Sequence, residues 1–171
     1  MPTNVEIKAS LTDRERALNT AARLSDSGRE IIHQQDIFFR CQGARLKLRI
    51  FAVDRGELIR YQRDDVAEVR CSQYSIARTS DPSVLVDILT KTLGQLGTVR
   101  KTRTLYRVGQ TRIHIDQVEG LGDFLELEVV LRIGQTEMEG KGIAEALLRE
   151  FGIEQKQLIG TAYIDLLARQ P

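Results

Sequence analysis

The chain has 171 residues, which is about the size of one domain, and 42% of them are hydrophobic. A domain of this size buries roughly 70% of the surface that its unfolded chain exposes, so we expect a single domain over residues 1–171. The 25 lysines and arginines balance 24 aspartates and glutamates, which excludes an acidic tail and a bulk-basic nucleic-acid binder. Cys41 and Cys71 form neither a zinc-site spacing nor a disulfide framework. No signal-peptide pattern and no membrane-length apolar run occurs, so we expect a cytoplasmic protein with no membrane partner.

The first half of the chain predicts a strand, a helix and four further strands. Residues 4–9 alternate polar with apolar side chains, which is the period of a half-buried strand. Thr12 and Glu15 form a capping-box pattern that opens a helix to about Ser25, with Gly28 as its C-terminal cap. The four strands that follow are expected at 31–40, 44–51, 57–63 and 68–78.

The second half predicts a helix, three strands and two more helices. Asp81 as N-cap and Pro82 at the first helical position begin a helix that ends at Gly94. The strands are expected at 97–107, 110–117 and 123–132, separated by glycine-containing turns. A second capping box, Thr136 with Glu139, opens a helix that runs to 152, and a short helix follows at 161–168.

Most of these strands follow one another through short turns, which favours antiparallel pairing and an α+β fold. Eight strands are enough to close a barrel that holds one small ligand. We therefore expect an eight-stranded antiparallel closed β-barrel with helices packed outside it.

Several predicted strands carry charged residues at every second position, so that the charges share one face. The alternation with leucine and isoleucine is clearest at Arg45, Lys47 and Arg49. The other rows are Glu6 with Lys8, Lys101 with Arg103, Arg112 with His114 and Asp116, and Glu126 with Glu128.

Like charges at alternate positions lie about 7 Å apart on one side of a strand and repel each other unless something between them is neutralised. Basic and acidic rows that face a common space suit a phosphate ligand with a metal ion, because guanidinium and ammonium groups bind phosphate and carboxylates bind Mg²⁺ or Mn²⁺. Solvated strand faces and charges that protect edge strands from aggregation explain the same residues one at a time. The joint occurrence of the rows at a net charge of +1 favours the charged interior.

The charged residues of these strands also form part of sequence motifs that resemble those of a known family. Asn4-x-Glu6-x-Lys8 is similar to the E-x-E-x-K signature of the CYTH superfamily, the triphosphate tunnel metalloenzymes. In chain order, the further similar segments are Gln35-Asp36-x-Phe38-Phe39, Arg45-Leu-Lys47-Leu-Arg49, Leu58-Ile-Arg-Tyr61-x-Arg63, Val99-x-Lys101-x-Arg103, Ile113-His-Ile-Asp116-x-Val118-x-Gly120-Leu-Gly122, Phe124-Leu-Glu126-Leu-Glu128 and Tyr163-Ile-Asp165. The ordered set covers essentially the whole chain and resembles the class IV adenylyl cyclase and thiamine-triphosphatase branch.

The resemblance implies a tunnel in which basic residues bind a triphosphate and acidic residues bind Mg²⁺ or Mn²⁺. The implied metal ligands are Glu6, Asp116, Glu126 and Glu128. The implied phosphate-binding residues are Lys8, Arg45, Lys47, Arg49, Arg63, Lys101 and Arg103. The residues expected to act in catalysis are Glu126, Glu128, Lys8 and Arg103.

One position departs from the signature, because Asn4 stands where the family has its first glutamate. An amide oxygen can ligate Mg²⁺ but brings no charge, which leaves open whether one metal ion or two are bound.

The expected function is metal-dependent hydrolysis of an organic or inorganic triphosphate. Cyclisation of ATP by the same residues is the alternative, and hydrolysis is favoured because cyclisation demands one specific ribose pose. Two further alternatives are a non-catalytic binder of polyphosphate or nucleotide, and an RNA-interacting domain with outward basic rows. We expect a small-molecule partner and no nucleic acid, and the sequence leaves a homodimer possible.

Overall fold

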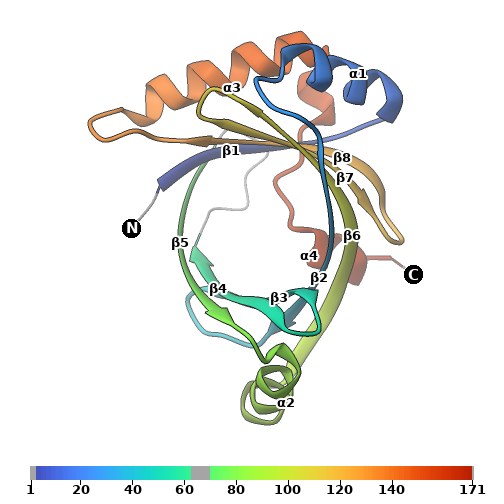
Figure 1. The fold of residues 1–171 in the computed structure, drawn as a ribbon, viewed down its shortest axis with the longest axis vertical. Coiled ribbons are helices and arrows are strands. Elements are labelled where there is room, and N and C mark those ends of the chain that lie inside the picture. The colour runs from blue at the N-terminus through green and yellow to red at the C-terminus, as the bar shows by residue number, and fades with distance from the viewer. Residues whose placement is uncertain (1–2, 63–69, 171) are drawn as a thin grey trace.

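The structure is a computed structural model that describes residues 3–62 and 70–170. Within these residues, eight strands form a closed barrel in the order β1-β5-β4-β3-β2-β6-β7-β8 (Figure 1). Every neighbouring pair is antiparallel, and β1 closes the barrel by pairing with both β5 and β8. The strands are β1 Thr3–Ser10, β2 Glu30–Phe39, β3 Arg45–Ala52, β4 Arg55–Gln62, β5 Arg70–Thr79, β6 Gln95–Val108, β7 Thr111–Val118 and β8 Gly122–Val130. The predicted α+β barrel is confirmed.

Four α-helices of the described chain lie outside the barrel wall: α1 Arg14–Leu24, α2 Pro82–Leu93, α3 Glu137–Phe151 and α4 Tyr163–Ala168, with a 3-10 turn at Gln155–Gln157. In Figure 1, α1 and α3 cover the side formed by β1, β7 and β8, and α2 lies at the opposite side. None of the helices in the described ranges has the length and apolar character needed to cross a membrane.

On β1, β7 and β8, the apolar residues point away from the barrel axis, toward the helices. Ile7, Ile113 and Leu127 on the outer face of the barrel pack with Ala21 of α1 and Leu148 of α3. On the opposite side, Phe39 and Leu48 pack against leucines of α2. A third cluster joins α4 to the strand ends, where the rings of Phe124 and Tyr163 lie 4.9 Å apart. Because period-two alternation sends the apolar set outward, it sends the charged set into the barrel.

The helix ends follow the sequence signals at both ends of α2 and of α3, and at neither end of α1. Asp81 caps α2, whose C-cap is Gly94, and the Thr136–Glu139 capping box is formed at the start of α3. The predicted start of α1 is wrong by one residue, because the Asp13 carboxylate, not Thr12, accepts the bond from Arg16 N at 2.9 Å. The C-cap of α1 is Ser25, and Gly28 lies in the loop beyond it.

Candidate active site in the barrel lumen

The inside of the barrel, called the lumen below, holds a cavity of about 460 Å³. All eight strands contribute side chains to its wall, and Ala162 and Tyr163 contribute from the segment that begins α4. A cavity of this volume is in the range of small-ligand sites. The predicted charged lumen therefore has room for a ligand.

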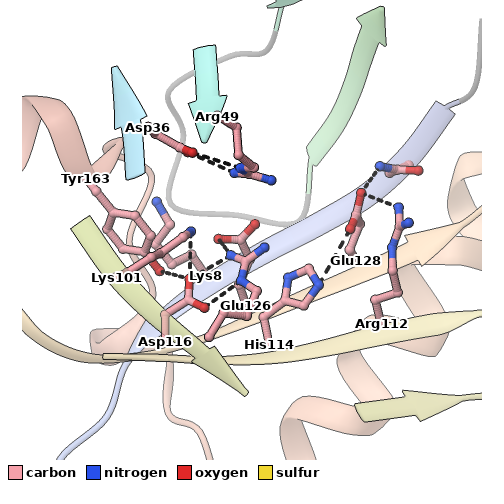
Figure 2. Close-up of polar contacts among 12 residues, drawn as sticks. Lys8, Asp36, Arg49, Lys101, Arg112, His114, Asp116, Glu126, Glu128 and Tyr163 are labelled. Carbon is pink, nitrogen blue, oxygen red and sulfur yellow. Dashed lines mark hydrogen bonds and ion pairs between the residues drawn. The ribbon is translucent and has the colours of Figure 1, made fainter. Parts of the chain in front are cut away.

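Five of the cations that line this cavity from β1, β3 and β6 are called the basic cluster: Lys8, Lys47, Arg49, Lys101 and Arg103. Lys8, Lys101 and Arg103 are each at most 8% exposed. Figure 2 shows members of the cluster from different strands converging on one region of the lumen. The strands thus bring together basic residues that lie far apart in the sequence.

Asp36 of β2 holds the two basic residues of β3. Its carboxylate accepts from Lys47 Nζ at 2.7 Å and from Arg49 Nε and Nη2 at 2.8 Å each. Burial would raise the pKa of Asp36, but the positive charges of Arg49 and Lys47 outweigh burial and hold it far below its usual value. Burial and the charge of Arg49 lower the pKa of Lys47 to about 7, against the opposing effect of Asp36. Asp36 is therefore ionised, and Lys47 changes its charge near neutral pH.

Asp116 of β7 plays the same part for the two basic residues of β6. Its oxygens accept from Lys101 Nζ at 3.0 Å, from Arg103 Nε and Nη2 at 2.6 Å each, and from Tyr163 Oη at 3.1 Å. Asp116 is fully buried and is not part of the cavity wall. Burial would raise the pKa of Asp116, but Arg103 and Lys101 lower it well below its usual value. The structure places this predicted metal ligand behind the basic cluster, with its oxygens already engaged.

The other predicted metal ligands lie together on β1 and β8. Glu6 is the register partner of Glu128, and Glu126 lies two residues along β8 on the same face. Glu126 lies 3.6 Å from Arg103 Nη2, and the nearby cations overcome burial and hold its pKa far below the usual value. Burial, together with the charges of Glu126 and Glu6, raises the pKa of Glu128, although Arg112 acts against it. The three carboxylates thus repel one another where the family signature expects a metal ion.

Glu128 is held from two sides. Arg112 Nη2 donates to Glu128 Oε1 at 2.8 Å (Figure 2). The Asn4 side-chain amide donates to the same oxygen. The side-chain oxygen of Asn4, Oδ1, is buried and has no hydrogen-bond partner among the described residues. Its position beside a carboxylate is suited to a cation.

His114 of β7 faces the lumen beside these carboxylates. Its side chain is buried, and its Nε2 lies 4.0 Å from Glu128 Oε2. Burial, followed by the charge of Arg103, holds the pKa of His114 well below its usual value, so the ring is neutral at pH 7.

One predicted phosphate-binding residue, Arg45, is not part of the basic cluster. Arg45 lies at the end of β3, outside the cavity wall, where its Nη2 lies 2.6 Å from Asp165 Oδ2 of α4. Arg63 lies outside the described residues, as does the side chain of Cys71. Cys41 is an exposed free thiol.

The donor set suits a hard divalent cation. Glu6, Glu126 and Glu128 offer carboxylate oxygens, and the unpartnered Asn4 oxygen lies next to them. Within 3–62 and 70–170, no three histidine, cysteine or acidic side chains are grouped so that they alone could hold a metal ion. An open set of oxygen donors is what Mg²⁺ uses when phosphate oxygens complete its shell, so the residues fit the family's metal.

Four residues that the structure places in the cavity wall were not predicted as metal ligands, phosphate-binding residues or catalytic residues: Asp36, Arg112, His114 and Tyr163. The parity of the Arg112-His114-Asp116 row is the signal for two of them, because residues i and i+2 share a face. Asp36 and Tyr163 matter through their partners on other elements, and single-strand periodicity does not show such partners.

Comparison with known proteins gives one family. The family model described as "CYTH domain" matches residues 2–163. A Methanocaldococcus jannaschii protein named "Putative adenylate cyclase" is 25% identical over 171 residues, which cover 95% of this chain and 97% of that protein.

Two solved structures share the fold. A Pyrococcus horikoshii protein has a TM-score of 0.85 at 21% identity, covering 95% of this chain and 98% of its own. A Hippeastrum protein, described as an adenylyl cyclase candidate that reveals a dominant triphosphatase activity, has a TM-score of 0.66 at 17% identity, covering 98% and 95%. The match along the chain, the closed eight-stranded barrel and the charged lumen lead to one conclusion: the chain belongs to the CYTH domain family.

Proposed function

We propose that this protein hydrolyses a triphosphate inside the lumen, with Mg²⁺ or Mn²⁺ as cofactor. The observation that carries the proposal is the basic cluster of β1, β3 and β6, which faces Glu126 and Glu128 across one cavity. Binding of a triphosphate requires several cations that contact its oxygens from different directions. Hydrolysis of its terminal phosphoryl group also requires groups that position a water molecule and accept its proton. The lumen offers both within about 460 Å³.

The basic cluster binds the phosphates. Arg49 and Arg103 offer guanidinium donors, while Lys8, Lys47 and Lys101 act as point charges. Asp36 and Asp116 position these donors, because each carboxylate holds one arginine through two bonds and one lysine through one. Asp116 is thus a positioning residue in this proposal, and Arg103 and Lys8 contact the substrate.

Glu6, Glu126 and Glu128, with the Asn4 oxygen, would hold the metal ion. When bound, such an ion withdraws electron density from phosphate oxygens and offsets their charge. Burial and the nearby charges of Glu126 and Glu6 raise the pKa of Glu128. A cation between the three carboxylates would relieve their mutual repulsion.

In the lumen without a metal ion, Glu128 is the better base of the two glutamates on β8. Its pKa is raised by burial, whereas the cations around Glu126 hold the pKa of that residue far below the usual value. A water oxygen attacks the terminal phosphorus, its proton passes to Glu128, and the bond from phosphorus to the bridging oxygen breaks. Arg103 and Lys101 stabilise the charge that develops on the leaving phosphate.

The test is incubation of the purified protein with tripolyphosphate, thiamine triphosphate and ATP, each with Mg²⁺ or Mn²⁺, and chromatography of the products. We expect orthophosphate release, lost in the double variant Glu126→Gln, Glu128→Gln, and retained in Glu119→Gln, which changes an exposed glutamate on the β7–β8 turn. Arg103→Ala is expected to weaken tripolyphosphate binding. Full turnover by the double variant would refute the proposed mechanism.

Cyclisation of ATP is the second candidate. The relative from Methanocaldococcus jannaschii bears an adenylate cyclase name, and aromatic side chains that suit a nucleobase line part of the cavity: Phe51, Tyr61 and Tyr74. In this reaction the ribose 3′-hydroxyl attacks the α-phosphorus and pyrophosphate leaves. The same chromatographic assay distinguishes the two reactions, because it separates cyclic AMP with pyrophosphate from ADP with orthophosphate.

A further inference from the structure

Tyr163, at the start of α4, lies against two lysines of the basic cluster. It is 7% exposed and lines the cavity together with Lys8 and Lys101. Lys8 Nζ lies 4.1 Å from the centroid of the tyrosine ring, and Lys101 Nζ lies 4.9 Å from it (Figure 2). One aromatic side chain thus contacts ammonium groups that come from two different strands.

Oxygen atoms beside the ring hold the same two lysines. Tyr163 Oη donates to Asp116 Oδ2 at 3.1 Å, and this oxygen also accepts from Lys101 Nζ at 3.0 Å. The backbone oxygen of Thr161 accepts from Lys8 Nζ at 3.0 Å. Each of the two ammonium groups therefore contacts both the ring and an oxygen, which restricts where it can lie.

The tyrosine ring is itself fixed, because α4 is attached to the barrel wall. The ring packs against that of Phe124 on β8, with the centroids 4.9 Å apart. A methyl group on Gly97 of β6 would lie 2.7 Å from Ile164 Cδ1, so α4 packs directly on the backbone of that strand. Asp165 of α4 forms an ion pair with Arg45 of β3 at 2.6 Å. Contacts with three strands thus keep the ring in its place.

An aromatic ring holds a lysine differently from a carboxylate. Its face attracts an ammonium group through the ring quadrupole and carries no net charge. Asp36 and Asp116 position their cations and also offset part of the positive charge. The ring instead leaves the charge of Lys8 and Lys101 available to a phosphate. Because a lysine loses rotamer freedom when it binds a ligand, holding it beforehand lowers that cost.

We propose that Tyr163 is a positioning residue of the phosphate site, whose ring holds Lys8 and Lys101 where they contact phosphate oxygens. Affinity for a phosphate chain then depends on the ring, although the ring itself carries no charge. The inference rests on the proposed function, because it concerns the same lumen and the same class of substrate.

The first test measures the dissociation constant of tripolyphosphate by calorimetry with no added metal ion. Tyr163→Leu removes the ring and keeps an apolar side chain, whereas Tyr163→Phe removes only the hydroxyl group. We expect binding to be about tenfold weaker in the leucine variant and to stay within about threefold of the wild type in the phenylalanine variant.

Tyr106→Leu is the matched control for a purely structural effect. Tyr106 is 5% exposed and packs in the core between the barrel, α1 and α3, and it is not part of the cavity wall. This variant should bind tripolyphosphate as the wild type does, even where its thermal denaturation temperature falls.

A spectroscopic measurement tests the contact itself and needs no variant that might fail to fold. In protein labelled with ¹³C-lysine, the ring current of Tyr163 should shift the ε-methylene protons of Lys8 and Lys101 upfield. Lys91, on the exposed face of α2, is the unshifted reference, and Lys8→Arg and Lys101→Arg assign the signals. The upfield shift should persist in Tyr163→Phe and disappear in Tyr163→Leu.

Wild-type affinity in Tyr163→Leu, an equal loss in Tyr106→Leu, or unshifted signals of both lysines in the wild type would overturn the inference. The two proposals fail separately. Tripolyphosphate binding that weakens in Tyr163→Leu, without orthophosphate release by the wild type, would keep the positioning role and refute hydrolysis. Orthophosphate release by the wild type, with undiminished binding in Tyr163→Leu, would do the reverse.

Discussion

The ammonium group of Lys47 lies within hydrogen-bonding distance of Asp36 and still has a pKa of about 7, because burial and Arg49 oppose its charge. Below that pH it is protonated and adds a positive charge to the lumen, and above it the charge is lost. We compare the tripolyphosphate affinity of the wild type and of Lys47→Arg by calorimetry between about pH 6 and pH 8. The affinity of the wild type is expected to rise less with pH than that of the variant, because the guanidinium of the variant stays charged. Running both proteins in the same buffers cancels the titration of the ligand itself. Identical pH profiles would contradict the role of Lys47.

Among the lumen carboxylates, Asp116 is the one whose replacement is expected to lower the free energy of unfolding most. Asp116→Asn leaves Lys101 and Arg103 buried without their counter-ion, and breaking a buried ion pair from one side typically costs about 3–5 kcal/mol. We expect a loss of this size in the free energy of unfolding from urea denaturation. Asp87→Asn is the comparison, because Asp87 pairs with Lys91 on the exposed face of α2 and such a pair contributes about 0.3–0.5 kcal/mol. Similar losses in both variants would show that the Asp116 network is not structural.

Which charged residues share a face was predictable from strand parity, and the family resemblance implied that this face is the inner one. Arg49, Arg103 and Glu128 all lie where the alternation with leucine, isoleucine and threonine places them. What each carboxylate does there was not predictable, because it depends on elements brought together by folding. Asp116 is engaged by Tyr163, which reaches it from α4, 47 residues away in the sequence.

At the scale of the element, α3 contains two glycines with opposite environments. A methyl group on Gly142 would meet no atom within 4 Å, whereas one on Gly140 would lie 2.6 Å from Leu131 Cδ2 and 2.7 Å from Val5 Cγ2. Val5 is fully buried and β-branched, so it cannot move aside. We expect Gly142→Ala to stabilise the protein by up to about 1 kcal/mol through helix propensity. Gly140→Ala should destabilise it, because overpacking costs about 1–3 kcal/mol.

Thermal denaturation of the two α3 variants, side by side, checks this pair. A stabilised Gly140→Ala protein would mean that α3 does not pack as closely on β1 as the structure shows. Both glycines weaken the helix equally in a propensity calculation, so only the packing of α3 on Val5 distinguishes them.

The start of α2 was predictable because two signals coincide there: Pro82 suits the first helical position, which selects Asp81 as the N-cap over Thr79 and Ser80. Asp81 before Pro82 and Gly94 at the end define α2 without ambiguity. Thr12 and Asp13 are both good N-caps in adjacent positions, and the Asp13 carboxylate makes the bond to the backbone. Local chemistry thus predicted that α1 exists, and three-dimensional geometry decided between the neighbouring caps.

For the whole molecule, the basic cluster ties ligand binding to barrel stability. A triphosphate that contacts β1, β3 and β6 at once binds only the folded barrel. At a concentration of about 100 times its dissociation constant, such a ligand should raise the free energy of unfolding by about 2.7 kcal/mol. Urea denaturation with tripolyphosphate, compared with sodium chloride of the same ionic strength, measures this. An equal gain from the salt would mean that screening, not binding, stabilises the barrel.

Closure of the barrel was the least predictable feature from periodicity, because alternation says nothing about which strands pair across the sequence. The antiparallel order was expected from short turns, but the pairing of β1 with β8 joins residues as distant as Asn4 and Val130. The family resemblance, which places the charged rows on one set of tunnel walls, implied that pairing.

Both neighbours of β1 are made later in the chain, since β5 starts at Arg70 and β8 at Gly122. During synthesis the N-terminal strand therefore leaves the ribosome long before either partner exists, and Glu6 meets Glu128 only after nearly the whole barrel has been translated. Such distant pairing is slow, so β1 stays unpaired for longer than the strands of the local hairpins. Pulse-labelled hydrogen exchange should accordingly show the β3–β4 hairpin protected before β1, and early protection of β1 would refute this order.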